Sequence, residues 1–264
     1  MLDQLEAVDA RFQEVEAQLQ DPAIVSDPKR LRELTRLRAE LEPVVKAWSE
    51  QRTRLKQLEE AGAAAIVMRS IFEEQIEADV AEMAASLAGD TSMAAIEYMR
   101  ADLLGQLGPE KYVEKLRAMR MAVKIPIIAS INCVKAANWI TYAKKLERAG
   151  ADAIELNLYH MPVDPEEDAA SVEARRLQVV KTIRNEVKVP ITVKLSKHYT
   201  SLLSFARMLD AAGVCGMVLF NRFLQTQIDT ETESIFYAHD YSSPHVLHSQ
   251  LRWTAVIRDW VRCS

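Results

Sequence analysis

Four polar residues stand at the points where apolar runs of this chain end, namely Asn132, Asn157, Lys194 and Asn221. Runs of this kind are typical of strands in a parallel sheet, because such strands are buried on both faces. The carboxyl ends of parallel strands share one edge, and in a β/α barrel the active site lies at that edge. Carboxamides offer hydrogen-bond donors and acceptors, and a lysine offers a cation. The four residues together therefore predict one ligand-binding site.

Each of the four residues also has a purely structural interpretation. An asparagine at the end of a strand can cap the helix that follows it, and a lysine there can simply point into water. Two features favour a site instead. Three asparagines occupy equivalent strand ends, and an apolar strand rarely closes on a lysine that has no partner.

The strands that carry these residues belong to an internal repeat. The sequence IPIIASIN at 125–132 reappears in altered form as VPITVKLS at 189–196. Each copy is preceded by Val-Lys and followed by a helical stretch that ends in Ala-Gly, at residues 149–150 and 212–213. A repeated unit of strand and helix predicts a parallel sheet with helical crossovers.

From about residue 58 onward, apolar runs alternate with amphipathic stretches. Strands are expected near residues 63–70, 125–132, 152–158, 189–195 and 215–221. Helices are expected at residues 73–87, 92–103, 109–122, 137–148, 168–186, 201–212 and 247–261. A closed barrel of this type needs eight strands. The predicted fold class is therefore α/β, an incomplete TIM-type (β/α) barrel of about five parallel strands.

The first 58 residues follow a different pattern. Apolar residues recur every three or four positions in two stretches, which Asp21-Pro22 separates. This spacing indicates two amphipathic helices. We therefore predict an N-terminal α-helical hairpin or short coiled coil at residues 1–58, followed by the partial barrel at residues 59–264.

Composition limits the classes of partner. The 264 residues carry a net charge of −5, which argues against a nucleic-acid surface built on phosphate contacts. The three cysteines are widely spaced, so they predict no disulfide framework and no metal site, and they fit a reducing cytoplasm. No stretch reaches the ~18 apolar residues of a membrane span. A cytoplasmic protein without nucleic-acid or membrane partners is expected.

An acidic cluster, Glu73, Glu74 and Glu77, stands at the start of a predicted helix. Acidic side chains there interact favourably with the helix dipole. A carboxylate pair for acid/base chemistry is the alternative interpretation.

Three strings in the first fifth of the chain resemble the N-terminal region of bacterial class I peptide chain release factors. They are MLDQLE at 1–6, LQDPAIVSD at 19–27 and LEPVV at 41–45. Members of that family hydrolyse the peptidyl-tRNA ester through a Gly-Gly-Gln loop, but this chain has no Gly-Gly pair. The resemblance therefore implies no translation-release activity.

A second set of motifs covers about four fifths of the chain: LEEAGAAAIV at 58–67, SIFEEQI at 70–76, IPIIASIN at 125–132, AGADAIELNL at 149–158, VKLS at 193–196 and VLFNRF at 218–223. In these motifs the chain resembles flavoproteins of the dihydroorotate dehydrogenase family, and most of all a dihydroorotate dehydrogenase-like branch. The resemblance implies a β/α barrel that binds FMN at its mouth, oxidises a dihydropyrimidine-like substrate and serves pyrimidine metabolism.

The same resemblance implies roles for individual residues. Lys194 would approach the N1/O2 edge of the flavin, where a cation stabilises the charge of the reduced ring. Ser70, Asn132 and Asn157 would contact the cofactor, and Asn157 with Asn221 would bind the amide edges of the substrate.

The expected catalytic base departs from the family pattern. Characterised members place Cys or Ser three residues after the asparagine matched by Asn157, where this chain has His160. His160 is expected to accept the C5 proton, since its reference pKa of about 6.5 suits a general base. The alternative is an edge histidine without a role. Tyr159 is a weaker candidate, because a phenol is mostly protonated at neutral pH.

The glycine positions bear on the cofactor. None of the seven glycines forms a Gly-x-Gly turn after a strand, although backbone phosphate cradles usually need one. The family's first strand and its last two, with their glycine-rich phosphate loops, find no counterpart here. We therefore expect an FMN-dependent oxidoreductase of dihydroorotate dehydrogenase type that is impaired and binds FMN weakly.

The alternative is a non-catalytic chimera in which the helical hairpin is a structural or interaction element. The partners expected are a small-molecule substrate, and either further copies of this chain or another chain that completes the barrel.

Overall fold

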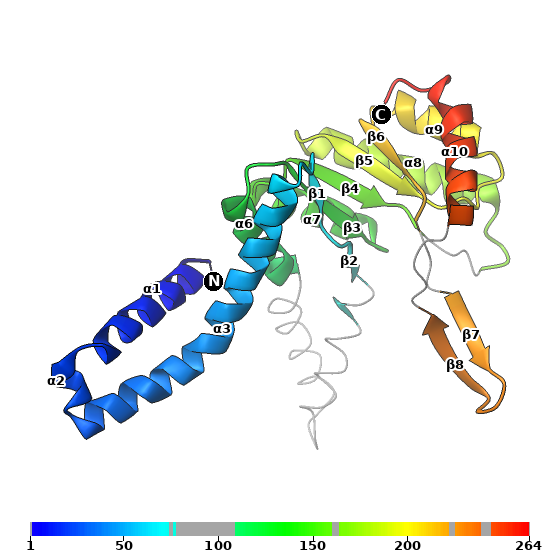
Figure 1. Ribbon diagram of the computed structural model, residues 1–264. Helices are drawn as coiled ribbons and strands as arrows, with labels where there is room; N and C mark the ends of the chain where they lie inside the picture. Colours follow the sequence, from blue (N-terminus) through cyan, green and yellow to red (C-terminus); the bar gives the residue numbers. More distant parts are fainter. Residues whose placement is uncertain are drawn as a thin grey trace, which may run out of the picture. The chain divides into compact units, whose positions relative to one another are not determined.

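The computed structural model of the chain (Figure 1) describes residues 2–73, 76–77, 109–159, 164–221, 225–238 and 244–263. The chain forms two units. Unit 1 comprises Met1–Ile66 and Glu110–Ile127, and unit 2 comprises Val67–Pro109 and Ile128–Ser264.

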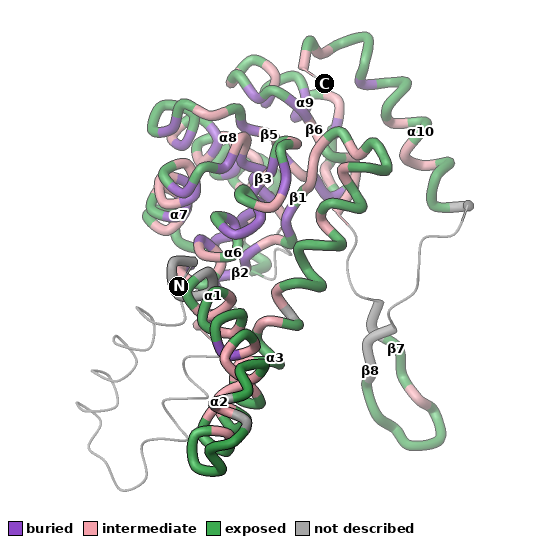
Figure 2. The backbone as a smooth tube through the Cα atoms, turned by 60° about the vertical axis from the view of Figure 1, so that its left-hand side comes forward, coloured by how far each residue is buried: buried purple, intermediate pink, exposed green. Residues whose placement is uncertain are grey.

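Unit 1 contains the helical hairpin predicted for the N-terminus. Helix α1 (Leu2–Leu19) runs back along α3 (Pro28–Glu60), and the short α2 (Pro22–Val25) connects them. The Asp27 carboxylate caps α3 by accepting hydrogen bonds from the Lys29 and Arg30 N–H groups at 3.0 and 3.2 Å, which are two of the donors that a helix start leaves unpaired. Figure 2 shows both long helices largely exposed or half-buried. A coiled coil stays a prediction.

Short parallel strands with helical crossovers form the sheet. The strands are β1 (Ile66–Val67), β2 (Ile71–Phe72), β3 (Ile127–Asn132), β4 (Ala153–Asn157), β5 (Ile191–Leu195) and β6 (Gly216–Leu219). Their order is β1-β3-β4-β5-β6, and β2 also pairs with β3. The crossover helices are α7 (Ala136–Arg148), α8 (Ala169–Glu186) and α9 (Leu202–Ala211), and α6 (Pro109–Ala122) precedes β3. This arrangement is an incomplete TIM-type barrel, which confirms the predicted fold class.

The two faces of this sheet differ in chemistry. Register pairs Ser130 with Glu155, and Asn157 with Lys194. Because side chains alternate along a strand, these residues share one face with Asn132 and Thr192, and we call it the polar face. The opposite, apolar face is fully buried and contains Ile131, Ile154, Leu156, Val193 and Leu195. Buried residues of α7, α8 and α9, including Trp139, Ile183 and Phe205, complete the core.

Three helices end in the same way. A glycine with positive φ follows α3, α7 and α9, at Gly62, Gly150 and Gly213, where the lack of a Cβ permits the left-handed turn. An acidic residue lies three positions before each glycine and accepts two backbone N–H bonds from a later loop. The acceptors and donors are Glu59 with Lys124 and Ile125, Glu147 with Lys188 and Val189, and Asp210 with Arg262 and Cys263. These bonds fix the loops that follow α6, α8 and α10 (Pro244–Arg258).

The strand and helix positions match the prediction closely along most of unit 2. The first strand is the exception, because only Ile66–Val67 pairs where residues 63–70 were predicted, and β2 is a separate short strand. The helix predicted at 92–103 lies outside the described residues, as does most of that at 73–87.

A hairpin of β7 (Gln225–Asp229) and β8 (Ser234–Ala238) was not predicted. The helix predicted at 247–261 is α10 (Pro244–Arg258). Among the described helices, none has an apolar stretch long enough to cross a membrane.

Candidate functional site

The four strand-end residues predicted to form a site lie together at the carboxyl edge of the sheet. The Asn221 side-chain amide donates a hydrogen bond to the Asn157 carboxamide oxygen at 2.9 Å. The Asn132 amide donates to the backbone oxygens of Asn157, at 2.8 Å, and Tyr159, at 3.0 Å. Lys194 is the register partner of Asn157 on β5. The parallel strands therefore bring all four residues to one place.

Ser70, expected to contact the cofactor, joins this group through a chain of hydroxyl contacts. The Asn157 amide donates to the Ser70 hydroxyl at 3.3 Å. The Ser70 and Ser130 hydroxyl oxygens are 2.6 Å apart, and the Ser130 hydroxyl donates to the Glu155 carboxylate at 2.6 Å. Residues from β3, β4 and the segments flanking β2 and β6 thus form one network.

Glu155 is the residue that the sequence did not single out. Its side chain is buried, with a residue exposure of 3%, and its carboxylate lies 3.8 Å from the Lys194 ammonium. A buried carboxylate needs such a partner, because removing its charge from water is costly. The signal was a lone acidic residue two positions before Asn157, and therefore on the same face of β4.

Lys194 and Asn157 differ in how accessible they are. The Lys194 side chain is 27% exposed, so its ammonium can approach a ligand while Glu155 orients it. Asn157 is 1% exposed, and its side chain donates a hydrogen bond to Ser70 and accepts one from Asn221. Asn157 therefore organises the network, and a ligand that contacts its amide must displace Ser70 or Asn221.

The expected base, His160, lies outside the described residues. Its neighbour Tyr159 is described, and burial raises the pKa of its phenol. A raised pKa keeps the phenol protonated at neutral pH, so Tyr159 is poorly suited to accept a proton.

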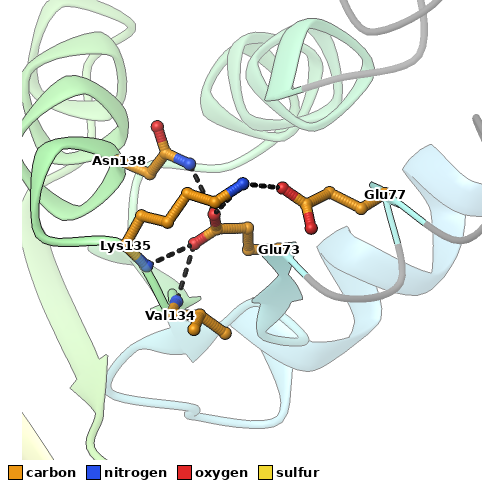
Figure 3. A network of polar contacts seen from close by, with 5 residues as sticks. All are labelled: Glu73, Glu77, Val134, Lys135 and Asn138. Carbon is orange, nitrogen blue, oxygen red and sulfur yellow. Dashed lines mark hydrogen bonds and ion pairs between the residues drawn. The ribbon is translucent and has the colours of Figure 1, made fainter. Parts of the chain in front are cut away.

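Glu73 and Glu77 of the acidic cluster have a structural role (Figure 3). The Glu73 carboxylate, on a residue that is 1% exposed, accepts hydrogen bonds from the Val134 N–H at 2.6 Å, the Lys135 N–H at 3.0 Å and the Asn138 amide at 2.5 Å. Lys135 also pairs with Glu77. Glu73 therefore caps α7, a helix from a different part of the chain.

Cys133 lies next to this cap. Burial, and then the Glu73 charge, raise the pKa of the Cys133 thiol well above its ordinary value. A thiol in this state is a poor nucleophile. Within the described part of the chain, no group of three or more His, Cys, Asp or Glu side chains is placed to hold a metal ion.

Comparison with known proteins gives two family matches. Residues 101–241 match the family model described as dihydroorotate dehydrogenase, and residues 8–119 match that of the PCRF domain. The catalytic subunit of dihydroorotate dehydrogenase B (NAD(+)) from Thermoplasma volcanium is 28% identical over 187 residues, which are 68% of this chain and 57% of that protein.

Two further similarities cover other parts of the chain. Peptide chain release factor 1 from Geobacillus kaustophilus is 35% identical over 83 residues, 31% of this chain and 21% of that protein. Among solved structures, a dihydrodipicolinate synthase from Agrobacterium tumefaciens aligns over 65% of this chain and 47% of its own, with a TM-score of 0.42 and 13% identity. The chain spans about half the length of the dihydroorotate dehydrogenases it matches.

Proposed function

We propose an oxidoreductase function for this chain, which belongs to the dihydroorotate dehydrogenase family. The proposed reaction is the FMN-dependent oxidation of a dihydropyrimidine-like substrate. The release-factor-like segment adds no chemistry to this proposal, because no Gly-Gly pair exists in the chain. The alternative of a non-catalytic chimera is not favoured, since the family match includes the strands on which the polar network lies.

The observation that carries the proposal is the position of Lys194. Its ammonium lies on the polar face, 3.8 Å from the buried Glu155 carboxylate, and 27% of the Lys194 side chain is exposed. Glu155 holds the side chain in place, and the ammonium group would stabilise negative charge on a ring bound over the polar face. A flavin bound there would supply the acceptor for the hydride.

The amide network fits the polar edge of a planar ring. Asn221 is half-exposed and donates to Asn157 through one N–H group, which leaves its other groups for a ligand. Asn132 and Ser70 hold the Asn157 backbone and side chain. Because these bonds already fix the network, ligand binding would lose less conformational entropy there.

His160 is the proposed base for the substrate C5 proton. It follows Asn157 by three residues, at the position where the family pattern has Cys or Ser. An imidazole with a pKa near 6.5 would be largely neutral at pH 7 and able to accept a proton.

The test of the flavin proposal is a titration of the full chain with FMN, followed by the quenching of flavin fluorescence and by visible absorption. The proposal predicts saturable quenching with one flavin per chain, at the weak affinity expected from the sequence. Colourless protein that leaves added FMN fully fluorescent would contradict it.

The base assignment has a separate test. We expect His160→Ala to lower turnover by about 10²–10⁴-fold, the usual contribution of a general base, while flavin affinity stays unchanged. His248→Ala, at an exposed histidine on α10, is the matched control. A His160→Ala variant that turns over as fast as the control would rule out this role.

A further inference from the structure

A pocket lies beside the polar network and shares none of its residues. It has a volume of about 190 Å³ and lies between the ends of β4 and β5 and the first turns of α8. Its lining includes Leu158 after β4, Val172 and Arg176 on α8, and Ser196, His198 and Tyr199 after β5. This volume is below the roughly 300–1,000 Å³ of sites for drug-sized molecules, so the pocket suits a small ligand.

Arg176 is the unusual residue of this pocket. It is only 6% exposed, yet its Nε–H group has no hydrogen-bond partner in the described parts of the chain. A buried donor without an acceptor costs free energy, and buried arginines are ordinarily paired. The buried Nε–H group of Arg176 would therefore be stabilised by a negatively charged acceptor.

The neighbouring charges in the described part of the chain leave the Nε–H group of Arg176 without an acceptor. Glu167, which also lines the pocket, is ion-paired with Arg175, the residue before Arg176. Burial first, and then the Arg175 charge, lower the pKa of Arg176, and the charges of Tyr199 and Glu167 raise it by less. Arg176 nevertheless remains a cation, because the guanidinium group does not lose its proton in proteins.

Two acidic side chains that line the pocket favour an anion with a single charge over one with two charges. Glu167 and Glu173 both line the pocket, and they would repel a phosphate dianion more strongly than an ion with one charge. A carboxylate has one charge and two oxygens in the plane that an arginine fork recognises. We propose that this pocket binds the carboxylate group of a small molecule, with the Arg176 guanidinium as its charged partner.

The proposal goes beyond the oxidoreductase function and does not depend on it. The flavin proposal rests on Lys194 and the amides of the polar face, whereas this pocket uses side chains of α8 and the loop after β5. Loss of FMN binding would therefore leave the carboxylate site intact, and the reverse also holds.

The test is the thermal unfolding of the full chain with sodium acetate, against sodium phosphate and sodium chloride at equal ionic strength. A ligand that binds only the folded state raises Tm. We expect acetate to give a saturable rise of roughly 3 °C at about ten times its Kd, and phosphate to give less. No acetate-specific rise, or a larger rise with phosphate, would overturn the proposal.

Variants locate the site. Arg176→Met should lose the response to acetate, while Lys181→Met, which removes an exposed cation from the same helix, should keep it. Val172→Phe fills the pocket without changing its charge and should also lose the response to acetate. If Arg176→Met does not fold, Val172→Phe still tests whether acetate binds in this pocket. An acetate response that survives in either pocket variant would place the binding elsewhere and refute the assignment.

Discussion

The two faces of the sheet in unit 2 differ in chemistry along the same two strands, β4 and β5. On the apolar face, Ile154, Leu156 and Val193 are fully buried. On the polar face, the neighbouring positions along the same strands are Glu155, Asn157 and Lys194. Glu155 accepts a hydrogen bond from Ser130 and pairs with Lys194, and Asn157 accepts one from Asn221. Strands of a parallel sheet usually have apolar residues on both faces. The difference indicates that the apolar face provides stability, and it supports our proposal of a site on the polar face.

Polar residues can occupy the interior of these strands because each has a partner. Ser130 donates to Glu155, Glu155 lies beside Lys194, and Asn157 lies between Ser70 and Asn221. Unpaired, such groups would each cost free energy when buried. Paired, they are fixed in position, which is what a binding site requires.

The largest effect is expected on the apolar face. Ile154→Ala removes a fully buried side chain from β4, and we expect it to lower the free energy of unfolding by about 2–5 kcal/mol. Urea denaturation followed by circular dichroism measures this loss. Thr192→Ala, on the half-exposed polar face of β5, is the control and should cost much less. Equal losses for the two variants would contradict the division of tasks between the faces.

A smaller effect is expected from the centre of the polar network. Glu155→Ala leaves the Ser130 hydroxyl without its acceptor and Lys194 without its carboxylate. We expect a loss of about 2 kcal/mol in the free energy of unfolding, the order of a hydrogen bond to a charged group. Glu155→Gln keeps an acceptor for Ser130 and should lose less. If Glu155→Ala were as stable as the parent chain, the network would contribute nothing to stability.

The smallest effect is expected from Asp210, an acid outside both faces that fixes a loop. Burial pushes the pKa of its carboxyl upward, but the hydrogen bonds from the Cys263 and Arg262 N–H groups outweigh burial, and the pKa lies below its ordinary value. A lowered pKa stabilises the folded state above the unfolded-state pKa of about 4, and this contribution is lost as the pH falls through the folded-state pKa.

The pH dependence of unfolding checks this sign. The parent chain should lose this stability below about pH 4, and Asp210→Asn should reduce that loss. Asp259→Asn, at an exposed acid paired with the adjacent Arg258, is the control and should leave the pH profile unchanged. A profile that Asp210→Asn does not alter would show that the loop bonds add no pH-dependent stability.

The strand-end residues that we predicted from the sequence share one property. The local alternation of apolar runs and polar residues is enough to locate each of them. Asn132, Asn157, Lys194 and Asn221 each follow an apolar run, and strand periodicity is enough to bring them to one edge. Their hydrogen bonds to each other were not predictable, because these depend on register between strands that are far apart in the chain.

Other features depend on distant partners and could not be read locally. Glu73 caps α7 through donors about 60 residues away, whereas from sequence it was assigned to its own helix. Arg176 resembles an ordinary surface residue of an amphipathic helix, and only the packing of α8 on the sheet buries it. The β7–β8 hairpin was missed because polar residues such as Gln225, Gln227 and Asp229 dilute its alternation.

The measurement that most directly tests the role of the polar face is the FMN dissociation constant of Lys194→Met, compared with that of Lys197→Met. Both variants remove one lysine, but Lys197 is exposed and lies beyond the end of β5. We predict that Lys194→Met weakens FMN binding about tenfold or more, the effect of losing roughly 1.4 kcal/mol, while Lys197→Met binds like the parent chain. Equal dissociation constants for the two variants would contradict a flavin site on the polar face.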